Sequence, residues 1–374
     1  MNHKGINILI TGIHGFVGSN LVNTLKDQYN IYGLDIVSPP KEGVIKTYTW
    51  ADLENIPPID VIIHLAGKAH DTKSQTNAQV YFDINTGLTQ KIYDWFLTTD
   101  ATKFIFFSSV KAAADKVEGD YLTEDVIPSP RGPYGESKIA AEKYIQKREE
   151  EPPAPKGEEE KKREEPPAPK GEEEKIQDSR AMGQEVSVED QDYLLPTTDY
   201  PLPTTHHPLK KTYILRPCMI HGPGNKGNLN LLYQVVKKGI PYPLGAFENR
   251  RSFTSIDNLS FVIQQLIEKE ILSGIYNVGD DETLSTNELI ALMANTMNKP
   301  NRTWKWNKSL VEFCALIGTV LHLPLNIDRL QKLTENYVVS NEKLKKALGI
   351  QSMPVSAEVG FKKTIESFGG RGKR

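Results

Sequence analysis

Cysteine is scarce in this sequence, which has only Cys218 and Cys314 in 374 residues. The two lie far apart and belong to no pairing or metal-ligand pattern, so we expect neither a disulfide framework nor a metal site. Sparse cysteine also fits a reducing compartment, and we expect a cytoplasmic protein.

Long apolar runs are absent as well. The opening residues, MNHKGINILITG, hold a short apolar run that enters a glycine-rich turn, which is typical of a buried strand and not of a signal peptide. The most apolar later stretch, VEFCALIGTVLHLPL at 311–325, is too short to span a bilayer and carries Glu312 and His322. This stretch predicts a packed helix.

Neither sign of charge is in strong excess, because 45 basic and 48 acidic side chains give a formal net charge of −3. Such a balance provides no general attraction to nucleic acid or to acidic membranes. We therefore expect neither as a partner.

The first half of the chain alternates short β-rich runs with segments of helical apolar spacing. The expected strands are NILITG, NIYGLDI, DVIIHLAG and KFIFFSS, and a further strand, KKTYILRP, follows at 210–217. Alternation of this kind predicts an α/β fold with a doubly wound parallel sheet. The later residues read as mostly helical and predict a smaller second domain.

One segment interrupts this pattern, since EEPPAPKGEEEK occurs twice, at 150–161 and 164–175. Residues 148–175 hold no apolar side chain except alanine and proline. Such a stretch cannot bury enough surface to offset its ordering entropy, so we expect disorder. An inserted linker is favoured over a docking tail, and the polar continuation to about His207 is read as loop.

Three glycines, Gly12, Gly15 and Gly18, follow the first expected strand and open a helix. This turn lets the backbone approach a pyrophosphate, and the helix N-terminus supplies amide donors. Asp35 ends the next strand, where a carboxylate can accept both hydroxyls of an adenosine ribose and would repel a 2′-phosphate. The pattern predicts NAD in preference to NADP.

Chemistry-bearing residues follow further along the chain. Ser109 ends the strand KFIFFSS, and Tyr134 and Lys138 stand four residues apart at the start of a helix. Residues i and i+4 share one helix face, so the lysine cation can lie beside the phenol. We expect it to lower the tyrosine pKa toward that of a general base.

Together the GxxGxxG turn, the strand-end serine and the YxxxK pair resemble the extended short-chain dehydrogenase/reductase family. The nearer resemblance is to its UDP-glucose 4-epimerase-like branch, in which HLAGKAH, LRPCMIHGPG and NRRSFTSIDNL also have counterparts. The resemblance implies a Rossmann domain at 1–147 and an insertion at 148–211. It further implies returning Rossmann strands mixed with substrate-binding segments at 212–280 and a substrate domain, mostly helical, at 281–374.

The resemblance also implies an activity. It implies an NAD-dependent 4-epimerase of a UDP-hexose or UDP-N-acetylhexosamine, in which Ser109, Tyr134 and Lys138 are catalytic. Further cofactor contacts carried over from the family fall on Phe16, Val17, Asp52, Leu53, Leu65, Ala66, Gly67, Asn85 and Pro217. Substrate contacts besides Ser109 fall on Asn228, Leu229 and Arg251. The local sequence NTGLT departs from the family pattern and leaves the helix start near Asn85 open, and His221 is read as structural.

Alternatives remain open at this point. A nucleotide 4-keto-sugar reductase would keep the same three catalytic residues but consume NAD(P)H. A 4,6-dehydratase is disfavoured because Val110 and Lys111 stand where that group has an Asp-Glu pair, and a non-enzymatic dinucleotide sensor is disfavoured because YxxxK is kept. By analogy with the family we expect a homodimer.

Overall fold

The computed structural model describes residues 5–69, 77–150, 209–225, 227–321 and 326–370. The main unit comprises Met1–Arg148 and Pro208–Arg374, and Glu149–His207 form a separate unit. Most of the predicted insertion, residues 151–208, lies outside the described residues. The account below concerns the main unit.

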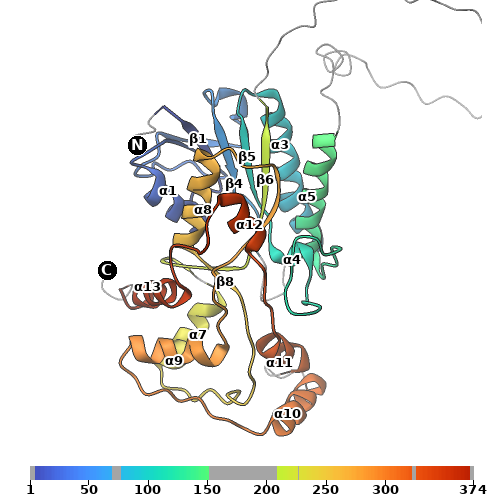
Figure 1. Cartoon of the computed structure of the whole chain (residues 1–374), viewed down its shortest axis with the longest axis vertical. Coiled ribbons are helices and arrows are strands. Elements are labelled where there is room, and N and C mark those ends of the chain that lie inside the picture. Colours follow the sequence, from blue (N-terminus) through green and yellow to red (C-terminus); the bar gives the residue numbers. More distant parts are fainter. Residues whose placement is uncertain (1–4, 70–76, 151–208, 226, 322–325, 371–374) are drawn as a thin grey trace, which may run out of the picture. The chain divides into compact units, whose positions relative to one another are not determined.

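Seven parallel strands form the central sheet (Figure 1), in the order β3-β2-β1-β4-β5-β6-β9. Their bounds are β1 Asn7–Thr11, β2 Asn30–Asp35, β3 Lys46–Thr49, β4 Val61–His64, β5 Lys103–Phe107, β6 Lys211–Pro217 and β9 Gly274–Val278. The order reverses direction beside β1, so the carboxyl ends of β1 and β4 flank the position where ligands of such sheets bind. The predicted doubly wound parallel sheet is confirmed.

Helices cover both faces of the sheet because alternate side chains of each strand point to opposite sides. On one face, Ile8 and Ile10 of β1 pack with α1 (Phe16–Leu25), α8 (Ile256–Glu268) and α12 (Glu342–Leu348). On the other face, Leu9 packs with α3 (Leu88–Thr98) and α5 (Pro133–Glu150). The two cores hold the strand ends in fixed positions.

A smaller lobe lies beyond the carboxyl ends of the strands (Figure 1). Its main core joins α7 (Asn228–Lys237), α9 (Thr286–Thr296) and α13 (Ala357–Gly370). A two-stranded parallel sheet pairs β7 (Met219–His221) with β8 (Phe253–Ser255). Along the chain, β7 connects β6 to α7, and β8 connects α7 to α8. A second, smaller core joins α10 (Lys308–Val320) to α11 (Ile327–Thr334). The mostly helical C-terminal portion is thus present as predicted.

Local signals in the sequence explain several element boundaries. Ser285 caps α9 in a reciprocal capping box with Glu288, as the sequence predicts for a serine before that helix. Strand β3 was not predicted, since KTYT is short and polar at one end and lies at the edge of the sheet. Among the described residues, no helix has the length and apolar character needed to cross a bilayer.

The helix that begins near Asn85 has an unusual geometry. A short helix, α2 (Ala78–Tyr81), continues through a π-helical turn, η2 (Phe82–Gly87), directly into α3. Turns of this kind insert one extra residue and often occur at functional sites. The helix start that NTGLT leaves open in the sequence is therefore a π turn inside a longer helix.

Candidate active site

The glycine turn between β1 and α1 is close-packed. Gly12 has φ +67°, a conformation that side chains other than glycine rarely adopt. A Cβ on Gly18 would lie 2.7 Å from the Gly12 carbonyl oxygen and 2.8 Å from the Ile13 Cα. Phe16 and Val17 follow as the first two residues of α1, whose free amides therefore point toward the turn. The turn provides the backbone surface that a pyrophosphate needs.

Asp35 lies at the end of β2 beside this turn. Its Oδ2 accepts a hydrogen bond from the His14 amide at 3.0 Å, and its Oδ1 accepts one from the Ile36 amide at 2.8 Å. Both bonds fix the carboxylate at the carboxyl edge of the sheet, next to the glycine turn. The predicted role of Asp35 as the ribose-binding acid thus falls on a carboxylate that lies beside the glycine turn.

The other residues predicted on the adenosine side lie in the same neighbourhood. Asp52 Oδ2 accepts bonds from the Thr49 amide at 3.1 Å and hydroxyl at 2.5 Å, and these bonds lower the pKa of Asp52. Leu53 is buried against the sheet, and Leu65 packs beside the other core. The Ala66 amide donates to Thr11 Oγ1 at 2.9 Å.

Ser109 and Tyr134 come together from two different elements. Ser109 follows β5 and caps the short helix α4 (Val110–Ala113), accepting a bond from the Lys111 amide at 3.2 Å. Its hydroxyl lies near enough to the phenol of Tyr134, the second residue of α5, to act on the pKa of that phenol. The two side chains, 25 positions apart in the sequence, therefore lie close together.

Lys138 lies one turn further along α5 and is almost fully buried. Its Nζ donates to the Phe107 carbonyl at 2.8 Å and lies 5.1 Å from the centre of the Phe106 ring. Loss of hydration lowers the pKa of Lys138 to about 8, and the negative charge of Glu142 acts against that lowering. A lysine so placed changes charge close to neutral pH.

The pKa of Tyr134 differs from the expectation. Burial raises it above its ordinary value, while the Ser109 hydroxyl acts in the lowering direction. Lys138 is not among the groups that shift this pKa, and its ammonium group donates instead to the Phe107 carbonyl. In this structure the phenol is therefore protonated at neutral pH.

We expect the lowered pKa of Lys138 to appear as a pH dependence of stability. Between about pH 8 and pH 10.5 the unfolded chain keeps this proton and the folded chain does not, so stability rises with pH. Across this window the free energy of unfolding of the wild type should therefore rise by about 3 kcal/mol relative to that of Lys138→Met. Urea denaturation at several pH values measures the difference.

Lys143→Met on the same helix provides the control, since Lys143 is exposed and should show no such trend. A flat difference between wild type and Lys138→Met from pH 7 to 10.5 would contradict the lowered pKa.

Asn85 connects the π turn to the catalytic helix. Its Oδ1 accepts a bond from the Lys68 amide at 2.7 Å, and its Nδ2 donates to Ser137 Oγ at 2.9 Å. Ser137 in turn donates to the Tyr134 carbonyl at 2.9 Å. A Cβ on Gly67 would lie only 2.9 Å from Asn85 Oδ1, so this glycine permits the close approach. The network holds the first turn of α5 against the loop after β4.

A buried histidine extends this network to the glycine turn. Thr89 donates to the Asn85 carbonyl at 2.6 Å, so its oxygen accepts from His64 Nε2 at 2.9 Å. His64 Nδ1 then accepts from the Thr11 hydroxyl at 2.7 Å. Burial holds the pKa of His64 well below its usual range, and the neutral ring links β1, β4 and α3.

The sequence analysis did not identify a buried ion pair between Glu142, one turn after Lys138 on α5, and Arg216. Arg216 Nη2 lies 2.6 Å from Glu142 Oε2, its Nε donates to Oε1 at 3.0 Å, and the Ser108 hydroxyl donates to Oε1 as well. Both charged side chains are almost completely buried. Two signals were present: an arginine inside the apolar strand KKTYILRP, and a glutamate four residues after Lys138.

The predicted substrate residues lie at different depths in the lobe. Asn228 begins α7, and the Leu229 side chain is buried in the main lobe core, which leaves its main chain for any contact with a ligand. Arg251 Nη2 lies 3.7 Å from Glu335 Oε1, and burial lowers its pKa. Its charge also acts on Lys111, which directly follows Val110 in α4. Arg251 thus lies on the side of the lobe that faces Ser109.

Two further predicted positions lie where the lobe meets the sheet. Pro217 ends β6 and pairs with Val278 of β9. His221 is fully buried, stacks on Phe361 with 3.8 Å between ring centres, and is bonded to Thr364 at 3.0 Å. These contacts fit the structural role expected of His221. No cluster that could hold a metal is found within the described ranges.

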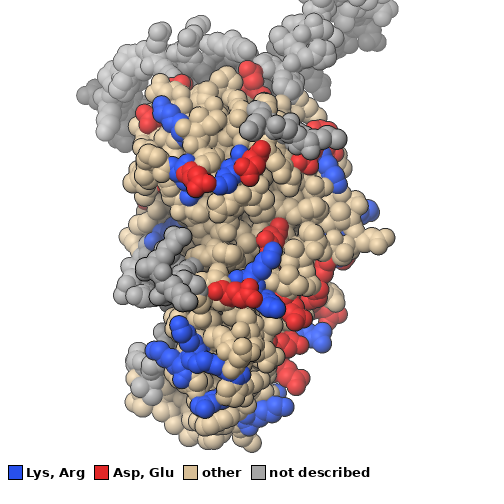
Figure 2. Space-filling model, turned by 90° about the vertical axis from the view of Figure 1, so that its left-hand side faces the viewer, with Lys and Arg blue, Asp and Glu red and all other residues tan. Residues whose placement is uncertain are grey.

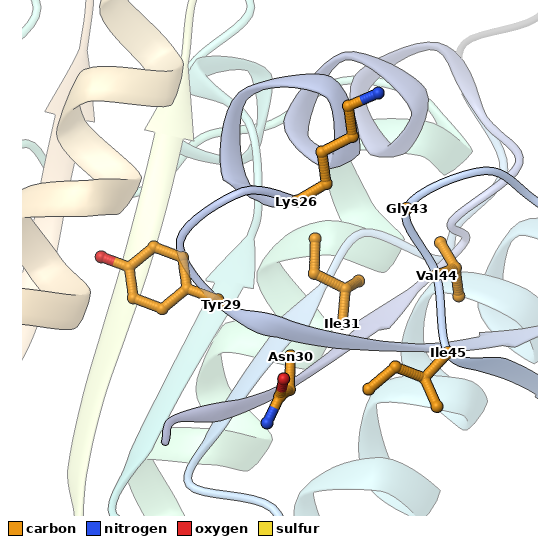
Figure 3. Close-up of a pocket in the computed structure, with 7 residues that line it drawn as sticks. All are labelled: Lys26, Tyr29, Asn30, Ile31, Gly43, Val44 and Ile45. Carbon is orange, nitrogen blue, oxygen red and sulfur yellow. The ribbon is translucent and has the colours of Figure 1, made fainter. Parts of the chain in front are cut away.

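A shallow pocket lies away from these residues, at the amino end of β2 (Figure 3). Lys26, Gly43 and Ile45 are among its lining residues, and Tyr29 donates to Glu268 Oε1 at 2.8 Å. Ligands of open α/β sheets bind at the carboxyl ends of the strands, so this pocket is at the wrong edge for the predicted chemistry.

The fold is that of a doubly wound α/β protein, and Ser109, Tyr134 and Lys138 lie at the carboxyl edge of its sheet. Residues 8–152 match the model of the NAD dependent epimerase/dehydratase family. The chain is 27% identical to UDP-glucose 4-epimerase of Vibrio cholerae over 96% of this chain and 95% of the relative. Over residues 8–152 the chain is therefore similar to this family, whose description names NAD as the cofactor.

Other relatives and solved structures agree in fold. An N-acetylglucosaminyl-diphospho-undecaprenol 4-epimerase of Escherichia coli O157:H7 is 22% identical over 78% of this chain and 73% of its own length. The UDP-N-acetylglucosamine 4-epimerase structure from Bacillus cereus aligns with a TM-score of 0.65 at 17% identity, covering 98% of this chain and all of that one. The UDP-glucuronic acid 4-epimerase structure from the same organism, in complex with NAD, gives 0.63 at 18% over 98% of this chain and 100% of that one.

Proposed function

We propose that this protein is an NAD-dependent 4-epimerase of a UDP-hexose or UDP-N-acetylhexosamine. The observation that carries the proposal is the proximity of Ser109 and Tyr134 at the carboxyl edge of the sheet, with Lys138 buried one turn below. The similarity to UDP-glucose 4-epimerase over almost the whole of both chains supports it. We further propose that the active form is a cytoplasmic homodimer.

The chain's residues fit a dinucleotide. The turn at Gly12, Gly15 and Gly18 packs its backbone too closely for a Cβ at Gly18, and the first free amides of α1 would bind the pyrophosphate. Asp35 would hold the adenosine ribose, and Lys138 would contact the second ribose. When bound, NAD accepts hydride from C4 of the sugar and later returns it.

The side chains of the site would handle the proton. Ser109 would bind the 4-hydroxyl, and Tyr134 would take its proton at the phenol oxygen. The phenol is protonated in the structure described above, so a positive charge must arrive to favour phenolate. The oxidised nicotinamide carries such a charge, and Lys138 adds a second one. Arg251 would hold the diphosphate, since a guanidinium fork suits that group.

The proposal is tested by incubation with a panel of nucleotide sugars and a catalytic amount of NAD, followed by NMR of the products. The panel holds UDP-glucose, UDP-N-acetylglucosamine and a polyprenyl-linked N-acetylglucosaminyl diphosphate, the last because of the E. coli relative. Product inverted at C4 without net NADH supports an epimerase. Consumption of NAD(P)H with a 4-keto sugar, and no inversion, would establish the reductase instead.

We expect Asp35→Ala to weaken NAD binding by roughly tenfold to a hundredfold, because a charge-assisted bond to a ribose hydroxyl is lost. Discrimination against NADP should relax as well, since the repulsion of a 2′-phosphate disappears. Titration with both dinucleotides, followed by protein fluorescence, measures the two effects.

Asp27→Ala is the matched control, because Asp27 is an exposed carboxylate near the other end of α1. Tighter binding of NADP than of NAD by the wild type would show that Asp35 does not set the preference.

A further inference from the structure

Helix α10 buries its small residues and exposes its large apolar ones, the reverse of what its sequence favours. Its small residues Ala315 and Gly318, together with Val311, face the core. Its large apolar residues face outward, and Phe313 and Val320 are 59% and 72% exposed. Large apolar side chains on an exposed helix face are unusual in a globular protein unless something covers them.

The exposed residues form one continuous stripe. Leu310, Phe313, Ile317 and Val320 are spaced three or four positions apart, and Leu321 follows Ile317 by four, so these residues lie on one side of the helix. We call these five residues the α10 stripe. Two tryptophans just before the helix, Trp304 and Trp306, are also about half exposed. Aromatic side chains of this kind favour the boundary between water and hydrocarbon.

Exposed basic residues lie in the segment that leads into the stripe and at the end of α7. Four of them recur at every third position of the segment that leads into α10, and two end α7: Lys299, Arg302, Lys305, Lys308, Lys237 and Lys238. We call these six residues the basic rim. The Arg302 side chain donates to the Gly239 carbonyl at 3.0 Å, and Lys299 donates to the Lys237 carbonyl, which brings the two groups together. Within 299–321, Glu312 is the only acidic residue.

Figures 1 and 2 share a vertical axis, and α7, α9, α10 and α11 lie at its lower end. Figure 2 looks onto the side of the lobe away from α10, and basic side chains gather on the lower part of that side, with acidic ones along one edge. Around α10 itself, residues 299–321 carry four basic side chains against Glu312, so the whole-chain charge of −3 conceals a local positive region. The expectation that no acidic membrane is a partner came from the whole-chain sum and does not describe this end of the lobe.

We propose that the α10 stripe and basic rim dock this lobe on the surface of an anionic bilayer. An apolar helix face that carries phenylalanine and leucine, bordered by lysine and arginine, is the pattern of a helix that lies in the membrane interface. The apolar stripe enters the boundary of the acyl chains, and the rim contacts the negative headgroups. The inference does not depend on the proposed reaction.

Two other occupants fit this surface less well. A second copy placed stripe to stripe would bring two basic rims together, and like charges at an interface oppose association. The segment 148–175 has acidic charge to offer the rim but no apolar side chain larger than proline to cover the stripe. An anionic bilayer satisfies both the apolar and the charged part of the surface.

The cysteines make a direct test possible. Cys314 is exposed on α10 and Cys218 is buried, so a thiol-reactive fluorophore will label position 314 selectively. The full chain, labelled in this way, is mixed with vesicles of phosphatidylcholine alone or with phosphatidylglycerol added. We expect a blue-shifted emission and quenching by spin-labelled lipids only with the anionic vesicles, and co-flotation of unlabelled protein with the same vesicles.

Two double variants divide the surface into its parts. Phe313→Ser/Ile317→Ser should lose most vesicle binding, with unchanged folding because both side chains are exposed. Lys305→Glu/Lys308→Glu should weaken binding at least roughly twentyfold, since each basic side chain near an anionic surface contributes about fivefold. Ile127→Ser/Leu272→Ser and Lys116→Glu/Lys143→Glu change exposed residues elsewhere, the apolar pair being more exposed than Phe313 and Ile317, and both variants should bind as the wild type does.

Absence of vesicle binding by the wild type overturns the proposal, as does equal loss in the control variants. A blue shift that depends on protein concentration and ignores spin-labelled lipid would show that a second copy covers the stripe. A 4-epimerase active in free solution is compatible with either result, so failure of this proposal leaves the proposed reaction intact.

Discussion

Replacing Tyr134 with phenylalanine should lower turnover by about two to four orders of magnitude, because the reaction loses its general base. The ring should keep its place, since its edge-on contact with Tyr81, at 6.4 Å between ring centres, does not involve the hydroxyl. Binding of NAD and nucleotide sugar should stay close to normal, because the proposed phosphate and ribose contacts lie on other residues. Steady-state kinetics on the true substrate, with separate titrations of both ligands, measure the effect.

Tyr121→Phe makes the same chemical change at an exposed tyrosine outside the site and should leave turnover unchanged. Retention of turnover within a few-fold of the wild type in Tyr134→Phe would refute the proposed proton transfer. A parallel loss of NAD affinity would instead indicate that the phenol supports the cofactor site, so the titration separates the two roles.

Much of the fold could be predicted because local patterns and the parallel sheet agree. Strand-forming runs alternate with helical spacing, and a parallel sheet brings all carboxyl ends to one edge. Gly12, Asp35 and Ser109 each follow a predicted strand directly, so their meeting at that edge was expected. The placement of Tyr134 also depends on a helix that begins at Pro133, and the sequence indicates this start because proline is favoured at the first helical position.

Features that depend on long-range packing were not predicted. The π turn at Phe82–Gly87 is stabilised through Asn85 by the loop after β4 and by α5, and no local pattern in the sequence indicates those contacts. The raised pKa of Tyr134 results from its burial, which the helical spacing of Tyr134 and Lys138 does not determine.

The orientation of α10 was also beyond the sequence. The stretch 311–325 was expected to pack as an apolar helix, and the helix is present at Lys308–Val320. Which face is buried depends on the neighbours available, and these are few: Leu244 and Leu330 form the small core with Val311 and Ala315. The apolar composition predicts that the helix packs against other residues, and only the structure shows which of its faces is left exposed to solvent.

The buried pair Glu142–Arg216 gives the second large expected effect. Glu142→Leu leaves the Arg216 cation almost fully buried without its carboxylate and removes the acceptor of Ser108. Breaking a buried pair in this way costs roughly 3–5 kcal/mol of unfolding free energy, because the remaining charge is uncompensated. Urea denaturation of the purified variant measures the loss, and the milder Glu142→Gln serves if Glu142→Leu does not accumulate.

The double variant Glu142→Leu/Arg216→Met removes both charges and should recover most of that stability, since a buried ion pair contributes little beyond an apolar pair of similar volume.

Catalysis should respond differently. Glu142 opposes the lowering of the Lys138 pKa, so without it this pKa should fall below about 8. The lysine would then lose its proton nearer neutrality, and turnover of the double variant should fall at a lower pH than that of the wild type. Stability losses below about 1 kcal/mol in Glu142→Leu, together with an unshifted pH profile in the double variant, would show that the pair neither stabilises the fold nor supports the charge of Lys138.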